Sequence, residues 1–399
     1  MAFELPDKPS IAVLPFMNIS GDPTKDFLSD GLTEDIINAL SMNPNIFVIA
    51  RNSTFTYKGK AVKVQQVAQE MGVQYVLEGS VQWSGDSVRI TAQLIDALKG
   101  RHLFSERYDR GLKDIFALQD EITMKVLVGI GVGLRRVDTA FLSTKEPQNL
   151  NAFLKLRQAR EHMTVFNKDN IALARKLTEE ALDLDPNYAY AYALLSGVNI
   201  IEVYVGASKS PMESLNRAEE LAKKAIAMDG SLVLSHSQLS LTYIFKRQFD
   251  KAVQEAEHAV ALAPASAYTC FQLGTALLHS ERFEEAIPHF KKSLRLSPTL
   301  PFSQCLVNLG GAYRFLGRYD ESIAAHKRVF QFYPDHLPGH IGLAATFVLA
   351  GRDEEARAEA AEVMRIDPQF SLERFARTLP FRQALVDDLV IAYRKAGLK

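Results

Sequence analysis

The side chains that could carry out chemistry are scattered along the chain, and their spacing suits structural roles. Asp30, Glu34 and Asp35 form a group of carboxylates near the start of an expected helix. Carboxylate oxygens can bind a hard metal ion, but acidic side chains at a helix start also stabilise the helix dipole without any ligand. We interpret the group as part of a helix start, capped by Asp30 or Thr33, and keep metal binding as the alternative.

Two short segments resemble parts of ligand-binding loops. Residues 129–133 (GIGVG) show half of a dinucleotide-binding pattern, but they follow a helical pattern rather than a strand. Residues 18–22 (NISGD) follow the first expected strand, where α/β proteins often bind ligands. We interpret the first segment as a chance match and the second as an ordinary strand-to-helix turn capped by Asp22.

Histidine and cysteine are not arranged as metal ligands. The nine histidines are scattered, and no cysteine stands at zinc-ligand spacing from one of them. Cys270 and Cys305 each lie in a helical pattern, so we expect two free, partly buried thiols. We therefore predict no catalytic residue, no metal, no cofactor and no enzyme activity.

Bulk composition is that of a globular protein with balanced charge. Hydrophobic residues make up 47% of the chain, charged residues 23%, and the net charge is −1. Proteins that bind nucleic acid through its phosphates usually present a basic surface, so we expect no nucleic-acid partner. The N-terminus lacks the segments of a secretory signal, and the most apolar stretch, 122–134, is shorter than the ~20 residues of a membrane span. We expect a cytoplasmic protein without a membrane span and leave its oligomeric state open.

A repeated phrase divides the second half of the chain. Apolar helical segments end at a proline or glycine at these positions: Pro186, Gly230, Pro264, Pro298, Pro334 and Pro368. The last four prolines are spaced by 34, 36 and 34 residues. Proline ends a helix because it has no amide hydrogen and disfavours helical backbone in the residue before it. The spacing predicts six helical hairpins.

Small residues recur where the two helices of each hairpin must touch. In the second helix they are Ala174, Ala218, Ala252, Ala286, Ser322 and Ala356. In the first helix they include Ser240, Gly274, Gly310 and Ala344. Such residues let two helix backbones approach closely. With the spacing of about 34 residues, this pattern resembles the tetratricopeptide repeat across residues 150–370.

The first 145 residues follow a different period. Short apolar runs alternate with helical patterns in the order β-α-β-α-β-β-β-α, which predicts a mixed sheet with helices on one face. The predicted fold is therefore an α/β (mixed sheet) N-terminal domain at 1–145, followed by an all-α tetratricopeptide superhelix of about six hairpins at 146–370. Residues 371–399 are expected to supply a C-terminal capping helix at 383–395, because solenoids need a polar terminal unit. A docking helix for a partner is the alternative.

Long motifs in the first domain resemble a known family. The segments PSIAVLPFMNISGDP, VIARNSTFTYKGK and YVLEGSVQWSGDSVRITAQLIDALKGRHLFSERYD are similar to the TolB amino-terminal-type domain across residues 8–125. The resemblance implies a bacterial protein of the kind in which this domain precedes tetratricopeptide repeats. That arrangement often forms the C-terminal half of class III adenylate or guanylate cyclases, or follows a winged-helix activator domain. We expect an adenylate cyclase-related chain without the cyclase catalytic domain.

The tetratricopeptide resemblance also implies a partner-binding groove lined by the first helix of each hairpin. Counting from the prolines assigns ten groove residues: Ser237, Leu241, Ile244, Phe271, Thr275, His279, Gln304, Val307, Arg314 and Phe315. Lys and Asn residues that hold a terminal carboxylate in chaperone-tail binders are not matched here. The apolar and aromatic mixture favours a peptide with apolar anchors. For each residue, packing between repeats is the alternative.

Two functions follow from these patterns. The first is a non-catalytic interaction scaffold or regulatory module, whose groove takes a protein or peptide partner or the chain's own α/β domain. The alternative is a small-ligand or nucleotide sensor module of an adenylate cyclase-type signalling system.

Overall fold

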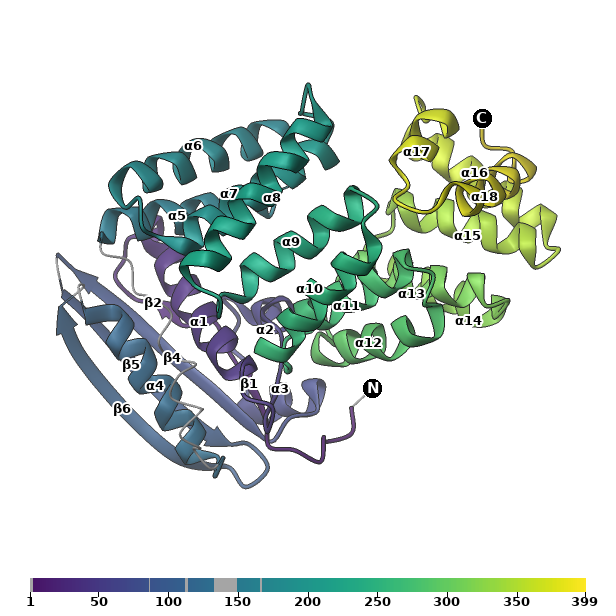
Figure 1. The fold of residues 1–399 in the computed structure, drawn as a ribbon. Coiled ribbons are helices and arrows are strands. Elements are labelled where there is room, and N and C mark those ends of the chain that lie inside the picture. The colour runs from purple at the N-terminus through teal and green to yellow at the C-terminus, as the bar shows by residue number, and fades with distance from the viewer. Residues whose placement is uncertain (1–2, 86, 112–113, 133–148, 166) are drawn as a thin grey trace.

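The computed structural model describes residues 3–85, 87–111, 114–132, 149–165 and 167–399. An α/β domain is followed by a curved array of paired helices, which confirms the predicted fold class (Figure 1). The predicted boundary between residues 145 and 146, and Gly133 of the glycine-containing segment, lie outside the described residues. None of the helices in the described part of the chain combines the length and hydropathy needed to cross a membrane.

The N-terminal domain is built around a six-stranded mixed sheet. Its strands are β1 (Ser10–Val13), β2 (Met17–Asn18), β3 (Phe47–Val48), β4 (Tyr75–Ser84), β5 (Ser87–Asp96) and β6 (Arg101–Gly111). The order is β3-β1-β4-β5-β6, and β2 pairs with β4. Strands β3, β1 and β4 run parallel, whereas β4, β5 and β6 form an antiparallel meander.

Helices cover both faces of this sheet, so the prediction of helices on one face is wrong. They are α1 (Asp26–Ser41), α2 (Arg51–Thr54), α3 (Val64–Met71) and α4 (Ile115–Gly129), with 3-10 turns η1 (Pro23–Lys25) and η2 (Phe55–Tyr57). Helix α1 packs on the face that carries Ile11 and Val13, and α4 packs on the same side against β5 and β6. Helix α3 packs on the opposite face, with Ala12 and Leu14. All four residues of β1 are buried. A central parallel strand is buried on both faces and needs cover on each.

Six antiparallel helix pairs follow in the described residues, the number that the proline spacing predicts. They are α5 (Leu150–Met163) with α6 (Lys168–Leu184), α7 (Ala189–Tyr204) with α8 (Pro211–Met228), α9 (Val233–Phe245) with α10 (Phe249–Leu262), α11 (Ala267–His279) with α12 (Phe283–Leu296), α13 (Ser303–Phe315) with α14 (Tyr319–Phe330), and α15 (Leu337–Leu349) with α16 (Asp353–Ile366). Each second helix ends two residues before its proline or glycine, except α14, which ends at Phe330, four residues before Pro334.

The small residues lie at the helix crossings, as predicted. All six in the second helices are completely buried: Ala174, Ala218, Ala252, Ala286, Ser322 and Ala356. Where a small residue is serine, its hydroxyl donates a hydrogen bond to a carbonyl of the facing helix, as Ser240 does to Ala252 at 2.8 Å. This bond satisfies the buried hydroxyl and leaves the close approach of the backbones intact.

The turns inside the hairpins share one backbone feature. In the fifth and sixth hairpins, Gly317 (φ 72°) and Gly351 (φ 74°) adopt left-handed backbone conformation. The equivalent residues of the third and fourth hairpins are Arg247 (φ 55°) and Glu281 (φ 62°). A side chain with positive φ is disfavoured by ~1 kcal/mol or more, so these two turns carry strain that the glycine turns avoid.

The chain ends in two further helices, α17 (Leu372–Thr378) and α18 (Gln383–Ala396). The predicted helix at 383–395 is confirmed. It packs mainly against α15 and also against α16, and it buries Val386, Leu389 and Tyr393. Residue Leu398 is also buried, so the C-terminal residues close the end of the apolar core.

The glycines of α13 provide a test of the close crossing. A Cβ added at Gly310 would lie 2.3 Å from Cε1 of the buried His326 ring, whereas one at Gly311 would have no described neighbour nearer than Nη2 of Arg314 at 4.0 Å. We expect Gly310→Ala to lower the free energy of unfolding by ~2 kcal/mol through overpacking. The control Gly311→Ala should be neutral or stabilising by up to ~1 kcal/mol, because alanine favours the helix. Urea-unfolding midpoints check both; equal effects would contradict the proposed crossing.

Candidate functional site

The ten predicted groove residues lie on three neighbouring helices, α9, α11 and α13. Five are buried: Ser237, Ile244, Thr275, His279 and Arg314. Five remain partly exposed: Leu241, Phe271, Gln304, Val307 and Phe315. The structure therefore brings the set together on the first helices of the third, fourth and fifth hairpins, with half of it covered by other parts of the chain.

A row of side-chain amides runs along these helices, and the sequence reasoning missed it. Gln304 donates to the Oδ1 of Asn308 at 2.8 Å, and Nδ2 of Asn308 donates to the Oγ1 of Thr275 at 3.1 Å. Gln272 donates to the hydroxyl of Tyr268 at 3.0 Å. The available signal was that amides recur at one repeat position, because Gln238, Gln272 and Asn308 are spaced by 34 and 36 residues.

The acidic residues of α1 form ion pairs with the first hairpin. Arg157 of α5 binds Asp35, and Arg160 binds Glu34. Helix α1 begins at Asp26, so the prediction that the carboxylates lie at the helix start, capped by Asp30 or Thr33, is wrong. The reason is that η1, whose backbone is capped by the side chain of Asp22, starts the helical segment earlier. Capping by Asp22 itself is confirmed.

Hydrogen bonds fasten the α/β domain to the C-terminal end of α12. Ala50 donates its amide to the carbonyl of Leu296 at 2.8 Å. The side chain of Arg295 donates to the carbonyls of Met71 and Gly72 at 3.1 and 3.0 Å. Figure 1 shows α1 and α2 beside the helices of the third and fourth hairpins. One end of these hairpins is thus covered by the α/β domain.

At the opposite end of the same hairpins, the chain's own C-terminal segment enters the predicted groove. The ring of Phe381, which follows α17, lies 4.5 Å from the ring of His279 and 5.6 Å from that of Phe315. Phe315 in turn stacks on Phe283 at 4.8 Å. Phe381 is only 7% exposed. An aromatic side chain of the chain itself therefore occupies the place that was predicted for an apolar anchor of a partner.

The electrostatics around this ring are unusual for a surface groove. Burial lowers the pKa of His279 to about 3, although a hydrogen bond to the carbonyl of Pro380 opposes the shift, so the ring is neutral. Arg314 is 7% exposed and donates from Nη1 to the carbonyl of Gly342 at 3.1 Å. Burial lowers its pKa as well. Its Nε has no hydrogen-bond partner among the described residues.

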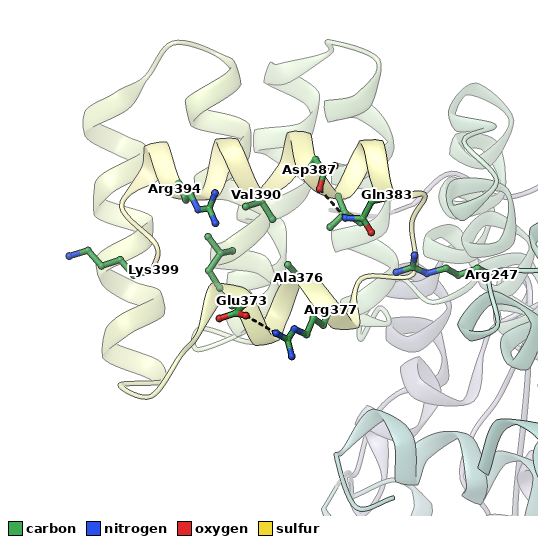
Figure 2. Close-up of a pocket in the computed structure, with 11 residues that line it drawn as sticks. Arg247, Glu373, Ala376, Arg377, Gln383, Asp387, Val390, Arg394 and Lys399 are labelled. Carbon is green, nitrogen blue, oxygen red and sulfur yellow. Dashed lines mark hydrogen bonds and ion pairs between the residues drawn. The ribbon is translucent and has the colours of Figure 1, made fainter. Parts of the chain in front are cut away.

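Two hollows flank the C-terminal segment. One of about 550 Å³ lies between α17 and α18, where Ala376 and Val390 face each other and Arg247 reaches in from the α9–α10 turn (Figure 2). The other, of about 540 Å³, lies over residues 247–251 and beside Arg382 and Gln383. The rims carry charges of both signs, and basic side chains outnumber acidic ones in each.

One group of three side chains in the described residues could share a metal ion: His236, Glu255 and His258. Both ring nitrogens of His236 are already engaged, Nδ1 with the Glu255 carboxylate at 2.7 Å and Nε2 with the Gly230 carbonyl at 3.2 Å. A ring that donates from both nitrogens is protonated and has no lone pair for a metal. The geometry therefore favours an ion pair between the two helices of the hairpin.

The same pair recurs in the sixth hairpin. Nδ1 of His340 meets the Glu359 carboxylate at 2.6 Å, and Nε2 meets the Pro334 carbonyl at 3.1 Å. Burial opposes the charge, but the carboxylate and the carbonyl outweigh it and raise the pKa of His340. The pKa of His236 is raised for the same reasons. Recurrence at one repeat position marks the pair as part of the repeat packing.

The raised pKa of His340 makes its contribution to stability depend on pH. The folded state binds the proton more tightly than the unfolded state, so the stabilisation is complete below the unfolded pKa of about 6.5 and is lost as pH rises through the folded pKa. We expect His340→Gln to lower Tm more at pH 6 than at pH 8.5. The control His102→Gln, at an exposed position of β6, should change Tm little at either pH. An equal loss for His340→Gln at both pH values would rule out the charged pair.

Comparisons with known proteins agree with this architecture. Residues 235–266 and 264–335 match models of the tetratricopeptide repeat. Residues 7–125 match the model described as HilA/YgeH-like transcriptional regulator, second domain. That stretch is nearly the one that resembles the TolB amino-terminal-type domain, and the TolB resemblance itself stays a prediction.

Among curated proteins, the chain is 42% identical over 256 residues to putative adenylate cyclase 3 of Rhizobium meliloti (strain 1021). The match covers 64% of this chain and 43% of the length of that relative.

Among solved structures, a thermophilic tetratricopeptide protein of Thermus thermophilus, TTC0263, aligns with a TM-score of 0.41 and 19% identity, over 49% of this chain and 99% of that one. The Cut9–Hcn1 assembly aligns with a TM-score of 0.48 and 17% identity, over 71% and 53%. The family models and the paired helices together identify residues 235–335 of the chain as tetratricopeptide repeats.

Proposed function

We propose that the chain is a non-catalytic, cytoplasmic interaction scaffold whose groove binds a peptide segment of a protein partner. The observation that carries the proposal is the amide row beside partly exposed apolar side chains. Gln304 is partly exposed on α13 and donates to the buried Asn308, and Leu241 on α9 and Val307 on α13 are apolar positions that remain partly exposed. An extended peptide needs both features, since amides can pair with its backbone and apolar positions can take its side chains.

The α/β domain gives this scaffold a fixed base. The contacts of Arg157 with Asp35, and of Arg295 with Gly72, join it to the first and fourth hairpins. Binding residues held by packed helices lose less conformational freedom when a ligand binds than residues on free loops do. We infer that the module is a regulatory part of an adenylate cyclase-related signalling protein, in keeping with the name of the relative from Rhizobium meliloti.

The groove can be tested with peptides and matched variants. A peptide library is selected against the immobilised chain, and the best peptide is measured by fluorescence anisotropy. We expect Leu241→Asp and Val307→Asp to raise Kd at least tenfold, because a carboxylate would be placed where an apolar side chain docks. The control Met364→Asp alters an exposed apolar residue of α16 and should leave Kd unchanged.

Two outcomes would count against the proposal. Peptides that bind equally well to all three variants would place the site elsewhere. A rise in Tm with ATP, GTP or a cyclic nucleotide, without selected peptides, would instead favour the alternative of a small-ligand or nucleotide sensor.

A further inference from the structure

The C-terminal segment of the chain crosses the ends of three repeats in an extended form. Residues 379–382 (LPFR) connect α17 to α18. Arg247, in the turn after α9, donates to the carbonyl of Leu379 at 3.3 Å. Nε of Arg382 lies 3.6 Å from the carboxylate of Glu281, in the turn after α11. With the contacts of Phe381, one short segment therefore meets the third, fourth and fifth hairpins, as a bound peptide could.

We propose that this surface is a docking site for a short extended segment of a partner protein, in which an aromatic side chain is followed by a basic one. Residues 379–382 occupy the site until such a partner displaces them. The proposal rests on the proposed function above and specifies the chemistry of its partner. The surface is formed by Arg247, His279, Glu281, Phe283 and Phe315.

The backbone of the two turns supports a role for their side chains. Arg247 and Glu281 adopt positive φ, whereas the equivalent Gly317 and Gly351 do so without a side chain. A side chain in this conformation is unfavourable and persists where the surroundings or a function require it. The two turns that carry the strain are the two that contact residues 379–382. The contact therefore accounts for side chains that the local backbone disfavours.

The packing around the segment makes it replaceable. Hollows of about 550 and 540 Å³ lie on its two sides, and both are lined by Arg247 and Gln383. The Arg382–Glu281 ion pair is largely exposed and therefore weak. The buried ring of Phe381 is thus the main anchor of the segment. A partner segment would therefore need to place one aromatic ring where the ring of Phe381 lies.

The closed arrangement also keeps an unneutralised charge buried. Arg314 has no carboxylate partner in the described part of the chain, and Tyr393 of α18 lies close enough to interact with it electrostatically. Its guanidinium carbon is 5.0 Å from the centre of the Phe315 ring, which contacts Phe381. A buried charge without a counter-charge is unfavourable, so the packing beside the segment opposes its displacement less than a fully satisfied interface would.

The test uses the full chain and a peptide of its own sequence. The probe is the fluorescent peptide ARTLPFRQAL, residues 376–385, with a second peptide that carries alanine in place of the phenylalanine. In the wild type the attached segment competes at a high effective concentration. We expect Phe381→Ala to bind the first peptide at least tenfold more tightly than the wild type does, and neither protein to bind the second peptide.

A second variant keeps the proposal testable if Phe381→Ala does not fold. Glu281→Gly removes a contact to Arg382 and relieves the strained backbone. We expect unchanged or higher Tm, together with amide exchange at Leu379, Phe381 and Arg382 at least fivefold faster than in the wild type. Unchanged exchange in this variant would show that the segment is a fixed structural part and would overturn the proposal.

The remaining outcomes are also decisive. A folded Phe381→Ala variant that does not bind the peptide would overturn the proposed docking site. The proposed function would stand in that case if library peptides still depended on Leu241 and Val307. A wild-type dimer that dissociates in Phe381→Ala, measured by sedimentation, would show that the segment docks on a second copy and would overturn displacement within one chain.

Discussion

The close approach of paired helices is the constraint on which the rest of the structure depends. Gly310 and Gly342 enclose the ring of His326 at distances that a Cβ would not permit, and Gly274 does the same for Phe290. Because the two helices of each hairpin lie so close together, the first helices of neighbouring hairpins stack side by side. Side chains 34 to 36 residues apart in sequence then form continuous rows, such as the amides of Gln272 and Asn308. The groove is thus a consequence of small residues at the crossings.

The helical hairpins and the C-terminal helix could be predicted because they depend on local spacing. Prolines, small residues and apolar periodicity all act within one repeat. The burial of groove residues under a distant segment of the chain could not be predicted from this local spacing. His279 and Arg314 occupy first-helix positions that the repeat pattern assigns to the groove, yet Phe381 and Tyr393 lie over them from a distant part of the chain. Periodicity shows which side of a helix a residue lies on, but it does not show which other segment covers that side.

Two further differences have particular physical causes. The alternation in β5 shows one buried face, but the apolar run at residues 11–14 (IAVL), which begins in β1, indicates two buried faces. That run was the sequence signal for a second layer of helices. The carboxylates of Glu34 and Asp35 gave no comparable signal. Their partners Arg160 and Arg157 follow 126 and 122 residues later, on the other side of the domain boundary. A group of acidic residues is ambiguous in sequence until its counter-charges are placed.

Helix α11 shows how the two ends of the molecule are connected. Its first turn packs through Ala267 and Cys270 against Phe47 and Ala50 of the α/β domain. Its last residue, His279, lies about 18 Å from Ala267 along the helix axis and contacts the ring of Phe381. A packed helix moves as a rigid body, so a change of occupant at His279 alters one end of an element whose other end is fixed on the α/β domain. Coupling between distant sites requires an element with two alternative arrangements, and in the proposed docking site that element is the segment at residues 379–382.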